Sequence, residues 1–264
     1  MTRKDYYPGE SKMQKQTKKL ALPNVTLIAV SSVNIYETVK ALQYSMQGID
    51  FGEVVLVTHR KPLFLPKEIT YKHTEKISNI DRFNYMMIYD LGQYVNTDYI
   101  ILVHADGFIV HPEKWQDAFL NYDYIGSPWP LPTAEHSTYY DAAGNICRVG
   151  NSVSLRSKRL LEFPKQAGLK WEPAADGYYN EDIFLCCMNK HRIEEAGMKI
   201  APIEVARYFG REHTLPETEG MEPFLFHKWW GENADFPRFQ NPITKIWLQI
   251  KAIRRKLMFW RKWD

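Results

Sequence analysis

A histidine and an aspartate two residues apart follow an apolar segment near the middle of the chain. The segment Tyr99–Val103 runs directly into His104, Ala105, Asp106 and Gly107. Because side chains alternate along an extended backbone, His104 and Asp106 are expected on the same side of it. A carboxylate and an imidazole together suit a divalent cation, Mn²⁺ or Mg²⁺, that is bridged to a diphosphate. The alternative is an ordinary Asp-Gly turn that follows a strand.

Two adjacent carboxylates, Glu181 and Asp182, open a segment that is predicted to form one long helix over residues 180–196. At a helix start, one of the two faces a cleft while the other faces the helix surface, so only one is expected to act. As a general base it would accept a proton from a hydroxyl nucleophile. The alternative, which the residues alone favour, is that both acids merely complement the helix dipole.

Two further groups are candidates for contacts with a bound ligand. His227, in the segment FLFHKWW, offers a third metal ligand or a phosphate contact with Lys228 beside it, whereas a packed core histidine is the alternative. Gly150 and Asn151 precede an apolar run and are expected to shape a cleft wall, because glycine permits close approach of a ligand to the backbone.

An alternation of apolar strands and amphipathic helices must position these residues. Strands are predicted over 24–33, 53–58, 69–73, 99–103, 147–155 and 199–203, and helices over 36–46, 81–95, 112–122, 158–163 and 180–196. This order predicts an α/β fold, a Rossmann-like α/β/α sandwich with a mostly parallel central sheet. Ligands of such sheets bind beyond the carboxyl ends of the strands.

The end of the first predicted strand is therefore a third candidate binding segment. Ala29, Val30 and Ser31 lie where a nucleotide base or ribose would dock at the carboxyl edge of the sheet. The alternative is a serine-rich turn whose hydroxyl groups cap the following helix.

Composition and charge exclude several classes of protein. The chain has 264 residues, 45% of them hydrophobic, and only 3 cysteines, which fits a globular enzyme of a reducing cytoplasm rather than a disulfide-stapled secreted domain. No apolar run approaches the length of a membrane-spanning helix. Residues 1–19 carry +4 and residues 241–264 carry +6 of the net charge of +3, which leaves −7 for the body. An acidic body argues against a nucleic-acid binder.

Five segments in order resemble a known family. They are DYIILVHADGFIVHPEKW, NYDYIGSPWP, RVGNSVSLRSKRLL, NEDIFLC and KIAPIEVARYFGRE. This set resembles a bacterial family defined by a domain of unknown function, which is itself similar to nucleotide-sugar glycosyltransferases of the GT-A fold, and the resemblance spans about residues 24–230. The family has Gln where this chain has His104, and it has paired glycines after Asn151 that this chain lacks.

The resemblance implies a metal-dependent glycosyltransferase that uses a nucleotide-diphosphate sugar. Asp106 matches the metal motif, His227 matches a late histidine near the metal, and Glu181-Asp182 matches the pair that supplies the base in inverting GT-A enzymes. The implied acceptor is a glycan or a lipid-linked hydroxyl, in bacterial surface polysaccharide synthesis. Alternatives are a sugar nucleotidyltransferase, although residues 29–34 lack its Gly- and Arg-rich triphosphate loop, and a non-catalytic module that binds glycan or membrane.

The two ends of the chain are predicted to lie outside the folded domain. Residues 1–22 are expected to form a flexible basic arm, residues 23–240 the GT-A-like domain, and residues 241–264 a basic amphipathic helix. Such a helix suits the surface of an anionic membrane, which would make the protein peripheral at the inner face of the plasma membrane. The alternative is that it packs on the acidic body or on a second subunit of an oligomer.

Overall fold

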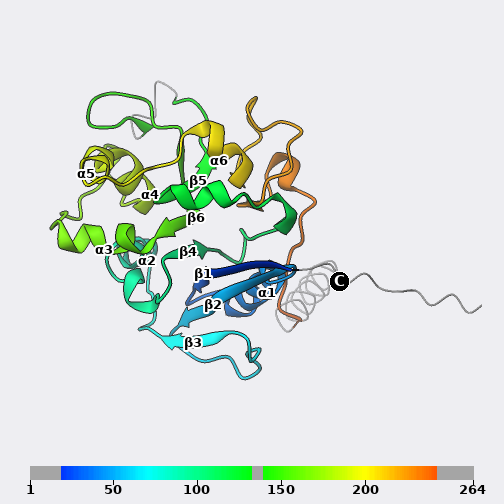
Figure 1. Ribbon diagram of the computed structural model, residues 1–264. Helices are drawn as coiled ribbons and strands as arrows, with labels where there is room; N and C mark the ends of the chain where they lie inside the picture. The colour runs from blue at the N-terminus through cyan, green and yellow to red at the C-terminus, as the bar shows by residue number, and fades with distance from the viewer. Residues whose placement is uncertain (1–18, 133–138, 243–264) are drawn as a thin grey trace, which may run out of the picture.

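A six-stranded sheet forms the centre of the computed structural model, which describes residues 19–132 and 139–242. Its strands are β1 (Leu20–Val30), β2 (Ile49–Thr58), β3 (Thr70–His73), β4 (Tyr99–Leu102), β5 (Tyr124–Pro128) and β6 (Val149–Ser157). Figure 1 shows them in the order β3-β2-β1-β4-β6-β5. Strand β6 is antiparallel to both of its neighbours and the other pairs are parallel, so five of the six strands run in one direction. The predicted α/β fold with a mostly parallel sheet is confirmed.

Helices cover both faces of this sheet. They are α1 (Ile35–Ser45), α2 (Ile80–Tyr89), α3 (Lys158–Gln166), α4 (Glu181–Ile183), α5 (Lys190–Glu195) and α6 (Ile203–Phe209). Leu27 of β1 packs in one cluster with Leu42 of α1, whereas the next residue, Ile28, packs in a second cluster with Met87 of α2. Buried strands with apolar side chains on both faces are the pattern expected of a parallel sheet between two helical layers.

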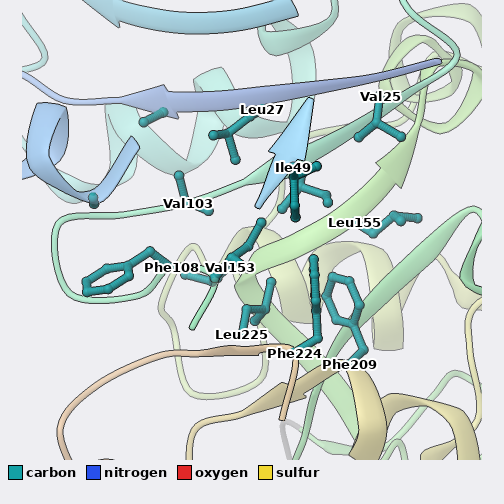
Figure 2. Packing of buried hydrophobic residues seen from close by; sticks show 14 of the residues in the cluster. Val25, Leu27, Ile49, Val103, Phe108, Val153, Leu155, Phe209, Phe224 and Leu225 are labelled. Atoms are coloured by element: carbon teal, nitrogen blue, oxygen red, sulfur yellow. The ribbon is translucent and has the colours of Figure 1, made fainter. Parts of the chain in front are cut away.

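The first of these clusters extends to the end of β4, where the candidate metal motif begins. Figure 2 shows Val103 and Phe108, which flank the motif, in the same cluster as Val153 of β6 and Leu225. Leu225 belongs to a two-stranded parallel sheet of β7 (Gly210–Arg211) and β8 (Leu225–Phe226). The turn after β4 is therefore anchored on both sides by fully buried residues.

Three predicted helices differ from the structure. The helix predicted over 81–95 ends at Tyr89 and is followed by a separate 3-10 turn, Leu91–Tyr94. Residues 112–122 form two 3-10 turns, Pro112–Lys114 and Asp117–Asn121, instead of one amphipathic helix. The long helix predicted over 180–196 is interrupted by a π-helical turn, Phe184–Met188, between α4 and α5. The Asn189 amide and side-chain nitrogens both donate to the Phe184 carbonyl oxygen, at 3.1 and 3.0 Å. The backbone hydrogen bond from Asn189 reaches the carbonyl group five residues earlier, instead of four residues earlier as in an α-helix, and this widens the turn.

Two predicted strand boundaries also move. The strand predicted over 199–203 is reduced to a single bridge between Ile200 and Tyr124, because Pro202 is already the N-cap of helix α6. Strand β1 begins at Leu20, inside the segment that was predicted to be a flexible arm over 1–22. The remainder of that arm, residues 1–18, and nearly all of the C-terminal helix predicted over 241–264 lie outside the described residues.

Candidate active site

A tight turn at the end of β4 carries the first two candidate metal ligands. The His104 amide donates to the Gly107 carbonyl oxygen at 2.7 Å, and the Gly107 amide donates back to His104 at 3.3 Å. A Cβ atom on Gly107 would lie 2.8 Å from Cδ2 of His227 and 2.9 Å from the Phe226 carbonyl oxygen. Glycine is required here because the turn packs directly on the segment that carries the third candidate.

Strand β8 brings this third candidate, His227, against the turn. The Phe226 amide donates to the Phe108 carbonyl oxygen at 3.2 Å, and the Lys228 amide donates to the Asp106 carbonyl oxygen at 2.8 Å. Strand β8 ends at Phe226, and Lys228 adopts a left-handed conformation with φ of 63°, which turns the chain out of the strand direction. Backbone bonds on either side of His227 therefore fix its position relative to Asp106.

The three predicted metal ligands converge on one point. One ligand atom each from His104, Asp106 and His227 lies within 4.8 Å of the others, and Nε2 of His227 is 3.8 Å from Oδ1 of Asp106. Nε2 of His227 is buried and makes no hydrogen bond among the described residues, whereas Nδ1 faces the carboxylate of Glu212. A buried ring nitrogen without a partner is costly, and a bound cation would satisfy Nε2. A donor set of one carboxylate and two imidazoles fits a divalent metal ion.

The protonation states of these ligands suit metal binding. Burial, with the nearby His227 as the next cause, lowers the pKa of His104 to about 3, so its imidazole is neutral at pH 7. Burial raises the pKa of Asp106, but His227 and the ammonium group of Lys228 outweigh it and leave this pKa below its usual value. Neutral imidazole and ionised carboxylate are the forms that bind a metal ion.

A positive charge already lies beside the candidate metal centre. The Lys228 ammonium group makes a short ion pair with Oδ2 of Asp106, and about a third of each side chain is exposed. The other oxygen of Asp106 faces His227. Lys228 thus lies next to the three candidate ligands.

A carboxylate without an assigned role in the sequence analysis, Glu212, lies directly behind His227. Its Oε1 is 3.2 Å from Nδ1 of His227, and its Oε2 accepts a hydrogen bond of 2.8 Å from the Asn151 side chain. Asn151 is 2% exposed, has a φ of 119°, and accepts a bond from the Val153 amide at 3.0 Å. The only sequence signal for Glu212 is its place at the end of the last family segment.

Of the predicted cleft-wall pair, Gly150 has a packing role. A Cβ atom on Gly150 would lie 1.7 Å from the ring of Trp129, so the indole occupies the space that any larger residue would need. Asn151 is the member of this pair that faces the site, through its bond to Glu212.

The adjacent acids Glu181 and Asp182 have different environments. Glu181 is 3% exposed and forms a buried ion pair of 2.9 Å with Arg156, which is fully buried. Burial, followed by the charge of Glu181, raises the pKa of Asp182 to about 8, and Glu212 adds to this shift. Asp182 is the more exposed residue of the pair, although its carboxyl group is enclosed and accepts a hydrogen bond of 2.9 Å from the Ile183 amide. A carboxyl group with a pKa near the working pH is a suitable general base.

The predicted nucleotide-binding segment lies at the carboxyl end of β1, as expected. The side chains of Ala29 and Val30 are buried on opposite faces of the sheet, so only Ser31 and the backbone can contact a ligand. The Ser31 amide is engaged with the Val57 carbonyl oxygen at 3.1 Å. The neighbouring Ser32 hydroxyl group accepts a hydrogen bond of 2.9 Å from the Ile77 amide and does not cap α1.

Comparisons with known proteins place the chain in a family. Residues 67–227 match the family described as "Protein of unknown function (DUF5672)", and the chain belongs to this family. Two similar solved structures are of the galactosyltransferase LgtC, one in complex with donor and acceptor sugar analogs and one an active-site mutant. Each is 12% identical over 81% of this chain and 92% of LgtC, with TM-scores of 0.48 and 0.49. No curated protein sequence matches.

These findings agree with the resemblance stated from the sequence. The family of unknown function is confirmed, and the sheet topology confirms the α/β/α sandwich with a mostly parallel central sheet that was expected of it. Among the described helices, none has the length and apolar character needed to cross a bilayer.

Proposed function

We propose that this protein is a metal-dependent glycosyltransferase that moves a sugar from a nucleotide-diphosphate donor to the hydroxyl group of a glycan or a lipid-linked acceptor. The observation that carries the proposal is the convergence of His104, Asp106 and His227 at the tip of a central strand, beside the ammonium group of Lys228. The setting we propose is bacterial surface polysaccharide synthesis at the cytoplasmic face of the membrane.

The donor side of the proposed site is built from the three ligands and Lys228. A divalent cation held there supplies Lewis-acid stabilisation of the departing diphosphate. Lys228 contacts a phosphate oxygen and adds a second positive charge where negative charge develops. The segment Ala29–Ser31 contacts the base or ribose through its backbone and the Ser31 hydroxyl group.

The acceptor side of the proposed site is built around Asp182. Its carboxylate form accepts the proton of the attacking hydroxyl group, which is the role expected in an inverting transfer. Glu181 does not take part in this proton transfer, because its charge is already paired with Arg156 at 2.9 Å. It fixes the start of α4 and so the position of the next residue.

A ligand panel on the full chain tests the donor side. We expect one nucleotide-diphosphate sugar to raise the melting temperature in the presence of Mn²⁺, and to raise it much less without the ion. Asp106→Asn should abolish the metal-dependent part. If no nucleotide sugar stabilises the chain with or without Mn²⁺, the protein is a non-catalytic module on the same fold and the proposal is wrong.

A pair of substitutions tests the acceptor side. Asp182→Asn should reduce the rate of sugar transfer by about 10²–10⁴-fold while donor binding stays unchanged. Asp235→Asn is the matched control, because Asp235 is an exposed aspartate with no assigned role at the site. Equal losses of donor binding and transfer in Asp182→Asn would show that Asp182 is a structural residue.

A further inference from the structure

The loop between β2 and β3 presents two large apolar side chains to solvent. Leu63 is 94% exposed and Phe64 is 95% exposed, the highest values among the large hydrophobic residues of the described chain. Figure 1 shows this loop at the outer edge of the sheet, beside the edge strand β3. Single exposed apolar residues are common on protein surfaces, but two adjacent ones at the tip of a loop form a local patch.

The outward direction of these two residues is set by the fold. The same loop turns Leu65 and Ile69 inward, where Leu65 packs against the main core cluster and Ile69 is 4% exposed. The Ile69 amide donates to the Pro66 carbonyl oxygen at 3.0 Å, and proline fixes its own φ. The loop therefore buries the apolar residues that the core can accept and holds the other two outside it.

Basic residues flank the exposed tip along the loop. Arg60, Lys61 and Lys67 are all exposed, and Glu68 is the one exposed acid between residues 60 and 68. An apolar tip with a basic rim matches the chemistry of a bilayer interface, where apolar side chains enter the acyl boundary and Lys or Arg meets anionic headgroups. A protein partner fits less well, because a standard interface buries about 800 Å² on each side, which is more than two exposed side chains at a loop tip can supply.

We propose that residues 60–67, the membrane-contact loop, dock this protein on an anionic bilayer surface. Leu63 and Phe64 enter the boundary between headgroups and acyl chains, and Arg60, Lys61 and Lys67 pair with lipid phosphates. This proposal does not depend on the glycosyltransferase activity. It also differs from the membrane contact predicted for residues 241–264, because it concerns a segment inside the folded domain.

Vesicle co-sedimentation of the full chain tests the loop directly. With vesicles of phosphatidylcholine and phosphatidylglycerol, Leu63→Ser/Phe64→Ser should weaken the partition coefficient by about tenfold or more, because each apolar side chain contributes to insertion. Ile80→Ser is the matched control, since Ile80 is 66% exposed on another part of the surface. Unchanged binding of the double variant would overturn the proposal, whatever residues 241–264 contribute.

A fluorescent probe at the tip gives a second, independent measurement. Cys147, Cys186 and Cys187 are all buried, so a dye that reacts with thiols would label the introduced cysteine of Phe64→Cys or of the control Ile80→Cys. We expect a blue shift on adding anionic vesicles at position 64 only. A dye that is already blue-shifted without vesicles would indicate that the chain itself or a second copy covers the tip, and would overturn the proposal. So would equal shifts at both positions.

Discussion

Replacing Glu212 by glutamine should weaken metal binding without changing the fold. The Glu212 carboxylate lies 3.2 Å from Nδ1 of His227 and accepts a hydrogen bond of 2.8 Å from the side-chain amide group of Asn151. A carboxylate at this distance favours the tautomer with the proton on Nδ1, which leaves the lone pair of Nε2 free for a metal ion. In Glu212→Gln, the oxygen still accepts from Asn151, but the amide nitrogen now faces His227. It favours the opposite tautomer, with a proton on Nε2.

The expected size of this effect follows from the role of residues that orient metal ligands. Loss of such a partner typically costs about 10–100-fold in metal affinity, which is about 1.4–2.7 kcal/mol. Titration of Mn²⁺ into the full chain by calorimetry, without donor, measures this affinity separately from turnover. Glu219→Gln is the matched control, because Glu219 is exposed and lies in the same connection between β7 and β8.

Two results would refute this reasoning about Glu212. The first is an unchanged Mn²⁺ affinity in Glu212→Gln, which would mean that His227 does not need its partner or does not bind the ion. The second is a melting temperature well below that of the Glu219→Gln control, which would show that the residue acts on folding. A loss of affinity with normal stability is the expected combination.

Three further predictions concern the charges around the site. The transfer rate at saturating donor should rise with pH and level off above about 8, because the raised pKa of Asp182 leaves its carboxylate form scarce at neutral pH; a pH profile without this limb would contradict the base role. Lys228→Gln should raise Mn²⁺ affinity by up to about fivefold, because the ammonium group no longer pairs with Asp106. It should also weaken nucleotide-diphosphate binding, and calorimetry with each ligand measures the two effects. Arg156→Met should lower the free energy of unfolding by about 3–5 kcal/mol, because Glu181 would remain buried without its partner; denaturant titration measures this loss.

The sequence predicts the position of a site residue best where neighbouring residues along the chain determine that position. The apolar run of β4 and the residues that follow it place His104 and Asp106 at a strand end, and alternation along the backbone puts them on one side. Glu212 had no such local signal. Its partners Asn151 and His227 are distant in sequence and reach it only through β6 and the pairing of β7 with β8. Its role therefore requires the tertiary structure.

The helix predicted over 180–196 shows the same limit within one element. Its apolar and acidic residues have helical spacing, but spacing does not report where a side chain competes for a backbone carbonyl oxygen. Asn189 does so at Phe184 and converts one turn to the π form. This wider turn begins two residues after Asp182 and carries Cys186 and Cys187, which are buried as small apolar residues.

The difference between Glu181 and Asp182 depends on which charges the fold places near each of them. Arg156 forms a buried ion pair with Glu181, which holds this carboxylate at a fixed position in the core. Asp182 has no such partner; its carboxyl group is enclosed, and the negative charges of Glu181 and Glu212 oppose its ionisation. Glu212 also faces His227 of the metal set. In the proposed mechanism, a cation held by the candidate ligands would offset the charge of Glu212 and so favour ionisation of Asp182. Loading of the proposed donor side and readiness of the proposed base would thereby be linked through one carboxylate.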